Sequence, residues 1–201
     1  MQEIWERIET QLRIEAWFEK MPVSEVLSDF QPGATEEEIQ AVEAALGIAF
    51  PEDVKASYHI HNGSNRQALI GDPDQNLWEL CSLTEVVSYW EMLEKYAAGW
   101  KVDLAHAGWF DGNGQPILVR VECWNVKWVP LLNSNGTLIC LDLAPTPHGH
   151  IGQIITNDPE NGTQWVAPSW QAFLSTFADD LEAGEYRLSL IHISEPTRQA
   201  E

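Results

Sequence analysis

The segment from residue 31 to 64 constrains the fold more than any other, because it sets where one helix starts and stops and where the next begins. Thr35 and Glu38 have the three-residue spacing of a capping box, which predicts a helix N-terminus here. Gly47 is the kind of residue that ends a helix in the left-handed conformation, and Pro51 suits the first position of a second helix. The segment therefore predicts two helices joined by a tight turn.

The apolar residues of this segment recur at helical spacing. Ile39, Val42 and Leu46 share one face of the first helix, and Val54 and Tyr58 share one face of the second. We expect both faces to be buried against the rest of the chain. Asn62 and Gly63 then form a turn signal that closes the unit.

Downstream, apolar and polar residues alternate in short runs separated by turn signals such as Asn133–Gly136 and Asn161–Gly162. Further helices are expected over 3–20, after a capping box at Ser82 and Glu85, and after Ser169. The pattern predicts a single α+β domain with a mostly antiparallel sheet of about six strands and helices packed at its N-terminal and C-terminal parts. The strand-like segments are 68–71, 77–80, 104–110, 116–122, 128–132, 137–143, 151–156 and 164–167.

Several of these motifs occur together in one known superfamily. The chain reads P-G-A-T-E-E-E-I, then A-L-G, F-P-E-D-V and H-N-G, and later W-V-P, N-G, L-I-C-L-D-L-A-P and H-G-H-I-G-Q-I-I. In order and spacing it resembles the SUKH superfamily of cell-wall-synthesis regulators and toxin-immunity proteins, over roughly residues 30 to 178. The resemblance implies a binding module without enzymatic activity.

The resemblance and the composition together divide the chain into three parts. Residues 1–29 are expected to be a helical extension that precedes the family-like domain at 30–187. Residues 188–201 resemble the translation of a transposon-end adapter used in sequencing libraries, and we expect them to be a non-native tail.

The charge of the chain restricts its partners. Eleven Lys and Arg against 31 Asp and Glu give a net charge of −20. Such a surface repels nucleic acids and anionic membranes and attracts basic proteins. The start of the chain lacks a basic signal, and its apolar runs are too short for a membrane span, so a cytoplasmic location is expected. Cys81, Cys123 and Cys140 are expected to be buried, reduced thiols, because their number is odd and their surroundings are apolar.

Catalytic and metal-binding motifs are weak in this sequence. Asp142 lies in an apolar run, where a carboxylate is either a buried general base or a cap on the next turn; we favour the cap. His59 and His61, like the pair at 148 and 150, lack a third ligand at a familiar spacing. We therefore expect no catalytic residues, no cofactor and no metal site. A hydrolase that uses Asp142 with a nearby histidine is the alternative from another functional class.

The sequence and the resemblance together favour an immunity protein that neutralises a basic toxin domain, such as a nuclease, through an acidic surface. A regulatory scaffold of the same superfamily is the alternative among binding proteins. The acidic turns are the expected contact points, because turn residues lie on the surface. The residues that we predict to bind the partner are Asp72, Asp74, Asp158 and Glu160.

Overall fold

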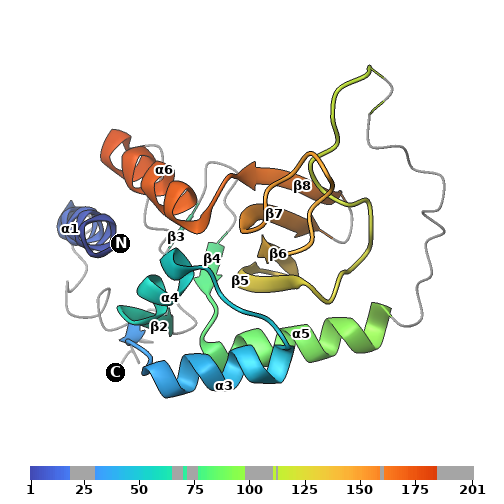
Figure 1. The fold of residues 1–201 in the computed structure, drawn as a ribbon. Helices are drawn as coiled ribbons and strands as arrows, with labels where there is room; N and C mark the ends of the chain where they lie inside the picture. Colours follow the sequence, from blue (N-terminus) through green and yellow to red (C-terminus); the bar gives the residue numbers. More distant parts are fainter. Residues whose placement is uncertain are drawn as a thin grey trace, which may run out of the picture.

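The computed structural model describes residues 1–18, 30–64, 70–71, 77–97, 111, 113–158 and 161–184. It confirms an α+β domain built around a six-stranded antiparallel sheet in the order β3-β4-β5-β6-β7-β8 (Figure 1). The strands are β3 Ile70–Gly71, β4 Leu77–Leu80, β5 Trp128–Ser134, β6 Thr137–Asp142, β7 Gln153–Asp158 and β8 Gly162–Ala167. Because each strand of this sheet pairs with its sequence neighbour, the sheet is a meander.

The two helices expected from residues 31–64 are present. They are α3 Glu36–Leu46 and α4 Glu52–Tyr58. Thr35 accepts from the Glu38 amide while the Glu38 carboxylate accepts from the Thr35 amide, so the capping box is complete. Gly47 ends α3 at φ 61°, in the left-handed conformation. Pro51 lies one residue before its predicted place, at the N-cap of α4.

A small second sheet was not predicted. Strand β1, Phe30–Pro32, pairs antiparallel with β2, His61–Ser64, which includes the expected turn residues Asn62 and Gly63. Both strands are too short to show an alternating pattern, so they were not recognisable in the sequence. The pairing brings the chain before α3 back beside the chain after α4.

The hairpin between β5 and β6 follows its sequence signal closely. Ser134 pairs with Thr137, which leaves Asn135 and Gly136 as a two-residue loop with φ angles of 49° and 97°. Positive φ at both positions is the type I′ turn that Asn-Gly favours, and its twist matches the twist of the strands. The hairpin prediction is confirmed.

The prediction of a strand at 116–122 is wrong, because the chain there is irregular. The strand expected to pair with it, at 104–110, lies outside the described residues. Carbonyl groups of the segment 116–122 bind side chains instead of a neighbouring strand. The carbonyl of Leu118 accepts from Gln153 Nε2 at 3.0 Å, and that of Arg120 accepts from Thr163 Oγ1 at 3.1 Å. Side-chain donors from β7 and β8 thus hold the segment against the sheet as irregular chain.

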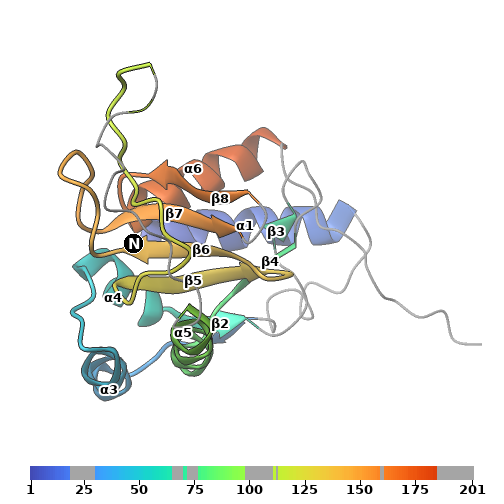
Figure 2. The same ribbon diagram turned by 90° about the vertical axis from the view of Figure 1, so that its right-hand side faces the viewer.

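Two hydrophobic cores lie on opposite faces of the sheet. The main core joins α1 Gln2–Phe18, α3, α4, the first turn of α5 Leu83–Ala97 and α6 Trp170–Ala183 to one face. The second core is smaller and packs irregular chain and α5 against the other face; its buried members are Val119, Trp124, Trp128, Leu138, Cys140 and Ile155. Figure 2 shows α6 running beside β8, with α1 behind it. The N-terminal helix therefore packs into the same core as the residues that resemble the family.

The cysteine prediction is correct for two residues and wrong for one. Cys81 and Cys140 are buried free thiols, and burial raises the pKa of both. Cys123 is exposed and lies in irregular chain rather than in a strand. Its apolar neighbours in the sequence suggested burial, and the adjacent Trp124 is buried in the second core, but the Cys123 side chain is not.

Candidate functional site

Of the four acids predicted to bind a partner, the structure describes Asp158; Asp72, Asp74 and Glu160 lie outside the described residues. Asp158 is half-buried at the end of β7, and its two carboxylate oxygens accept hydrogen bonds from strand β6 and from the β7–β8 turn. Oδ2 accepts from Thr137 Oγ1 at 3.1 Å, and Oδ1 accepts from the Asn161 amide at 2.9 Å. The partner-binding role of this set stays a prediction.

Asp142 is a buried cap that joins three segments. Its Oδ1 accepts from the Ala144 amide at 2.9 Å and from Trp128 Nε1 at 3.1 Å, and its Oδ2 accepts from Gln153 Nε2 at 2.8 Å. Burial raises the pKa of Asp142, and these hydrogen bonds act in the opposite direction. Because protein donors occupy both oxygens, the arrangement suits a structural role.

The histidines of the first pair have separate partners. His59 Nδ1 donates to the Ala34 carbonyl and Nε2 contacts Glu36, whereas His61 Nε2 contacts Glu9 at 2.9 Å and its ring stacks on Phe30. The second pair is exposed in the loop between β6 and β7. Within the described part of the chain, no group of three or more His, Cys, Asp or Glu side chains is placed to hold a metal ion.

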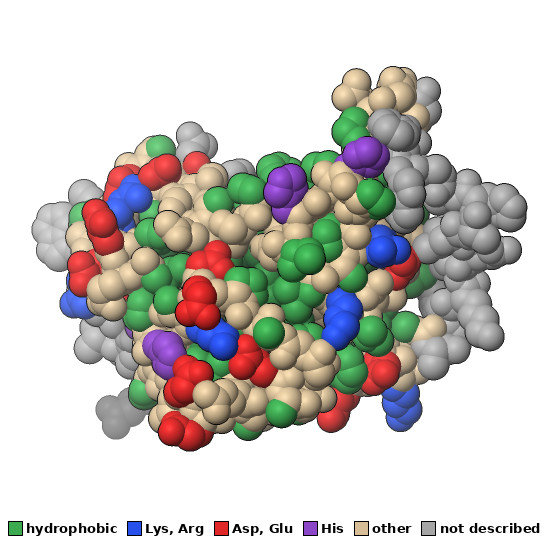
Figure 3. Space-filling view, in the orientation of Figure 1, with side chains coloured by type: hydrophobic (Ala, Val, Ile, Leu, Met, Phe, Trp, Pro, Cys, Tyr) green, Lys and Arg blue, Asp and Glu red, His purple; other side chains and the backbone are tan. Residues whose placement is uncertain are grey.

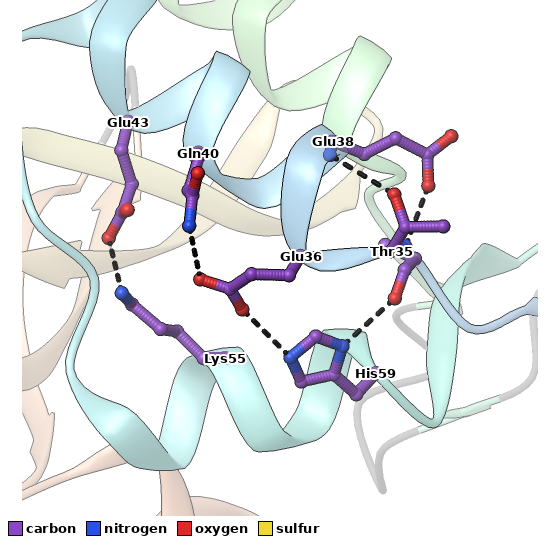
Figure 4. A network of polar contacts seen from close by, with 8 residues as sticks. Thr35, Glu36, Glu38, Gln40, Glu43, Lys55 and His59 are labelled. Carbon is purple, nitrogen blue, oxygen red and sulfur yellow. Dashed lines mark hydrogen bonds and ion pairs between the residues drawn. The ribbon is translucent and has the colours of Figure 1, made fainter.

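The acids of α3 form a polar network with α4 (Figure 4). Glu36 accepts from Gln40 and contacts His59, and Glu43 pairs with Lys55 at 3.1 Å. The hydrogen bond from Gln40 lowers the pKa of Glu36, and the hydrogen bond that Lys55 donates to Glu43 raises the pKa of Lys55. These groups bind one another, so the network mainly fixes the angle between the two helices.

Acidic side chains gather at the C-terminal end of α6 and over α3 and α4 (Figure 3). At the end of α6, Arg7 of α1 contacts Asp179 at 2.6 Å and Glu182 at 2.8 Å. Asp180 stands between these two acids in the sequence. Its side chain makes no hydrogen bond or ion pair with any described residue. One carboxylate at this end of α6 is therefore uncompensated.

An apolar groove runs between α6 and the sheet, with a volume of about 300 Å³. Its floor is a row of side chains across neighbouring strands, in which Leu132 pairs with Ile139 and Ile139 pairs with Thr156. Val166 of β8 continues the floor at one side and Trp78 of β4 at the other. Thr156 and Ala167, which have small side chains, also line the groove.

The wall of the groove is one stripe of α6. Phe173, Thr176, Phe177 and Asp180 are spaced by three or four residues, so they lie on the same face of the helix. Thr176 is exposed and Asp180 is half-buried. The groove is thus apolar inside and carries the uncompensated carboxylate of Asp180 in its wall.

Comparison with known proteins identifies the family. Residues 33–176 match the SMI1 / KNR4 family (SUKH-1). The chain belongs to this family. The SUKH resemblance drawn from the sequence motifs is confirmed, and the matched residues run from the turn before α3 into α6.

Proteins from three fungi align with most of the chain. The "Cell wall biosynthesis/cell cycle regulator smi1" of Schizosaccharomyces pombe is 30% identical over 185 residues, covering 87% of this chain. The "Cell wall assembly regulator SMI1" of Saccharomyces cerevisiae is 30% identical and covers 77%, and the "Glucan synthesis regulatory protein" of Neurospora crassa is 26% identical and covers 87%. The chain spans 36% to 38% of the length of these relatives.

The family match places most of the groove inside the shared domain. The whole floor and the wall residues Phe173 and Thr176 lie within the matched segment, whereas Phe177 and Asp180 follow its end. The sequence predicted a helix after Ser169 but gave no sign of a groove beside it. Spacing on α6 shows which residues share a face, but the space above the sheet depends on how the helix crosses it.

Proposed function

We propose that this chain is a regulatory protein-binding domain that acts in cell-wall or glucan synthesis. The observation that carries the proposal is that two relatives, each 30% identical to this chain, are both named regulators of the cell wall. The sequence analysis favoured an immunity protein and kept the regulatory scaffold as its alternative. The names of the relatives support the alternative better.

The proposal assigns no catalytic activity to the domain. The relatives are named as regulators. Asp142, the candidate general base in the sequence, has both carboxylate oxygens hydrogen-bonded to protein donors. A general base must reach a substrate proton through a free lone pair in an accessible place. Asp142 is fully buried beneath its own turn, which supports a structural role instead.

The charge of the domain supports a basic partner. With a net charge of −20, the chain attracts positively charged proteins and repels nucleic acids. Among the described residues, no helix combines the length and the apolar character that crossing a membrane requires. We propose that the domain binds a basic protein segment through its surface.

A chimera tests the regulatory role directly. The 183-residue segment of the Saccharomyces cerevisiae regulator that aligns with this chain is replaced by residues 1–187, and the chimera is expressed in cells that lack the regulator. If the domain performs the family's regulatory task, the chimera restores wall glucan content and growth under wall stress. A second chimera with a flexible linker of equal length serves as the baseline.

The two chimeras must accumulate to the same level, as measured by immunoblot, for the comparison to hold. Rescue by this domain above the linker baseline supports the proposal. A domain chimera that accumulates normally and performs no better than the linker would contradict it.

Neutralisation of a toxin is a second candidate function, and the net charge of −20 is the observation that favours it. A toxin that cleaves nucleic acid needs a basic surface, to which an acidic protein is complementary. This candidate predicts a gene for a toxin with a variable C-terminal domain beside the gene for this chain. Sequencing of the flanking genomic DNA tests it.

A further inference from the structure

We propose that the groove between α6 and the sheet binds a partner segment in which a large apolar side chain lies next to a Lys or Arg. This inference rests on the proposed function as a protein-binding domain and specifies which surface is used. The apolar side chain enters the groove, and the cation pairs with Asp180. The groove residues themselves carry the argument, in three steps.

The first step is the size and lining of the groove. About 300 Å³ is at the lower end of the range for ligand pockets, which hold a few polar groups in an apolar lining. Here Leu132, Ile139 and Val166 supply the apolar floor, and Phe173 supplies an aromatic wall. A cavity of this size suits one large side chain of a partner rather than a cofactor.

The second step is that the groove is built on rigid elements. Leu132 and Ile139 are 2% and 4% exposed and belong to paired central strands, so the floor cannot rise to fill the space. The helix above is fixed at its start by the Ser169 cap and packs against α1. A preformed site avoids part of the ordering cost of binding.

The third step is charge. Asp179 and Glu182 are neutralised by Arg7, whereas Asp180, which lines the groove, has no such partner among the described residues. An acid in the wall of an apolar groove strengthens binding of a cation that arrives with an apolar group, because the surroundings screen the pair less than water does. This complementarity selects a basic peptide over an acidic one.

The test is a selection of 12-residue peptides, displayed on phage, against immobilised residues 1–187. The expected clones combine Trp, Phe, Leu or Met with a Lys or Arg within three residues. Synthetic peptides from these clones are then measured by fluorescence anisotropy. We expect Asp180→Lys to weaken binding at least tenfold, and Thr176→Trp to weaken it similarly by blocking the groove from an exposed position.

Matched controls separate the groove from general effects. Glu91→Lys makes the same charge change at an exposed site on α5, and Gln171→Trp places the same bulk on an exposed site of α6 outside the groove. All four variants must keep the melting temperature of the wild type. We expect both controls to bind as the wild type does.

The outcomes distinguish this inference from the proposed function. Peptides that bind Asp180→Lys and Thr176→Trp as well as the wild type, enrichment of acidic peptides, or no enrichment would each overturn the groove assignment. If the groove variants also rescue the chimeric strain fully, the regulatory proposal stands and the binding surface lies elsewhere. If the groove binds basic peptides but the wild-type chimera fails to rescue, the proposed function fails and the binding site remains.

Discussion

At the scale of single residues, buried polar groups hold the irregular parts of this fold in place. Gln153 is the clearest case: Nε2 donates to Asp142 and to the Leu118 carbonyl, while Oε1 accepts from the His150 amide. One side chain thus hydrogen-bonds to polar groups in three separate segments. Two of these segments are irregular chain without strand-to-strand hydrogen bonds. Replacement of any member leaves another buried group unpaired, which costs more than the hydrogen bond itself contributes.

Asp142→Asn tests this dependence. The new amide can accept through one oxygen but presents an NH₂ group to donors that need an acceptor, so a buried donor is left unpaired. We expect the free energy of unfolding to fall by about 1–3 kcal/mol. Urea denaturation followed by tryptophan fluorescence measures the change. An unchanged midpoint would show that the carboxylate is not the structural cap described here.

Leu46→Ala tests the core face of α3. Leu46 is 6% exposed and lies in the main core with Ile39 and Val42. Its truncation removes buried methyl groups and leaves a cavity, so we expect a loss of about 2–5 kcal/mol. Chemical denaturation gives the value, with exposed Glu37→Ala as the control. A change below about 0.5 kcal/mol, as at a surface position, would mean that the helix face has been assigned wrongly.

At the scale of elements, α1 and α6 are joined both by apolar packing and by the ion pairs of Arg7. The hydrogen bond from Arg7 lowers the pKa of Glu182 below its ordinary value. A carboxylate with a depressed pKa stabilises the fold above the pKa of the unfolded chain, about 4.3, and loses that contribution as the pH falls through the folded pKa. The link between these two helices therefore weakens in acid.

Arg7→Gln should reveal this pH dependence. Above pH 5 we expect a slightly lower melting temperature than that of the wild type, because the exposed pairs contribute little. At a pH below the depressed pKa of Glu182, the variant and the wild type should have the same melting temperature. Differential scanning calorimetry from pH 3 to 7 measures both curves. A difference in melting temperature that grows as the pH falls would contradict the stabilising role of this ion pair.

At the scale of the whole molecule, the described N-terminal helix is part of the packed domain although the family match begins at residue 33. Trp5 and Ile8 are buried in the main core, and Trp5 Nε1 donates to Ser57 of α4 at 3.0 Å. Such contacts bury apolar area that the remaining helices cannot cover alone. The expected tail at 188–201 lies outside the described residues.

Two truncations test this organisation. Deletion of residues 188–201 should leave the melting temperature unchanged, since we expect a non-native tail without a place in the core. Deletion of residues 1–18 should lower it sharply or cause aggregation, because a strip of the main core becomes exposed. Thermal unfolding monitored by circular dichroism compares both with the full chain. A loss of several degrees on removing the tail would mean that the tail packs natively.

Local chemistry in the sequence determined the helix caps, the β5–β6 hairpin and the apolar faces of α3 and α4, because Thr35, Gly47 and Asn135–Gly136 act through neighbours a few residues away. It also determined the family and the net charge. Only the tertiary structure decided that 116–122 is irregular chain and that Asp179 is neutralised while Asp180 is not. It alone decided that a groove remains above Thr156. These outcomes depend on contacts between residues far apart in the chain, whose distances no local pattern records.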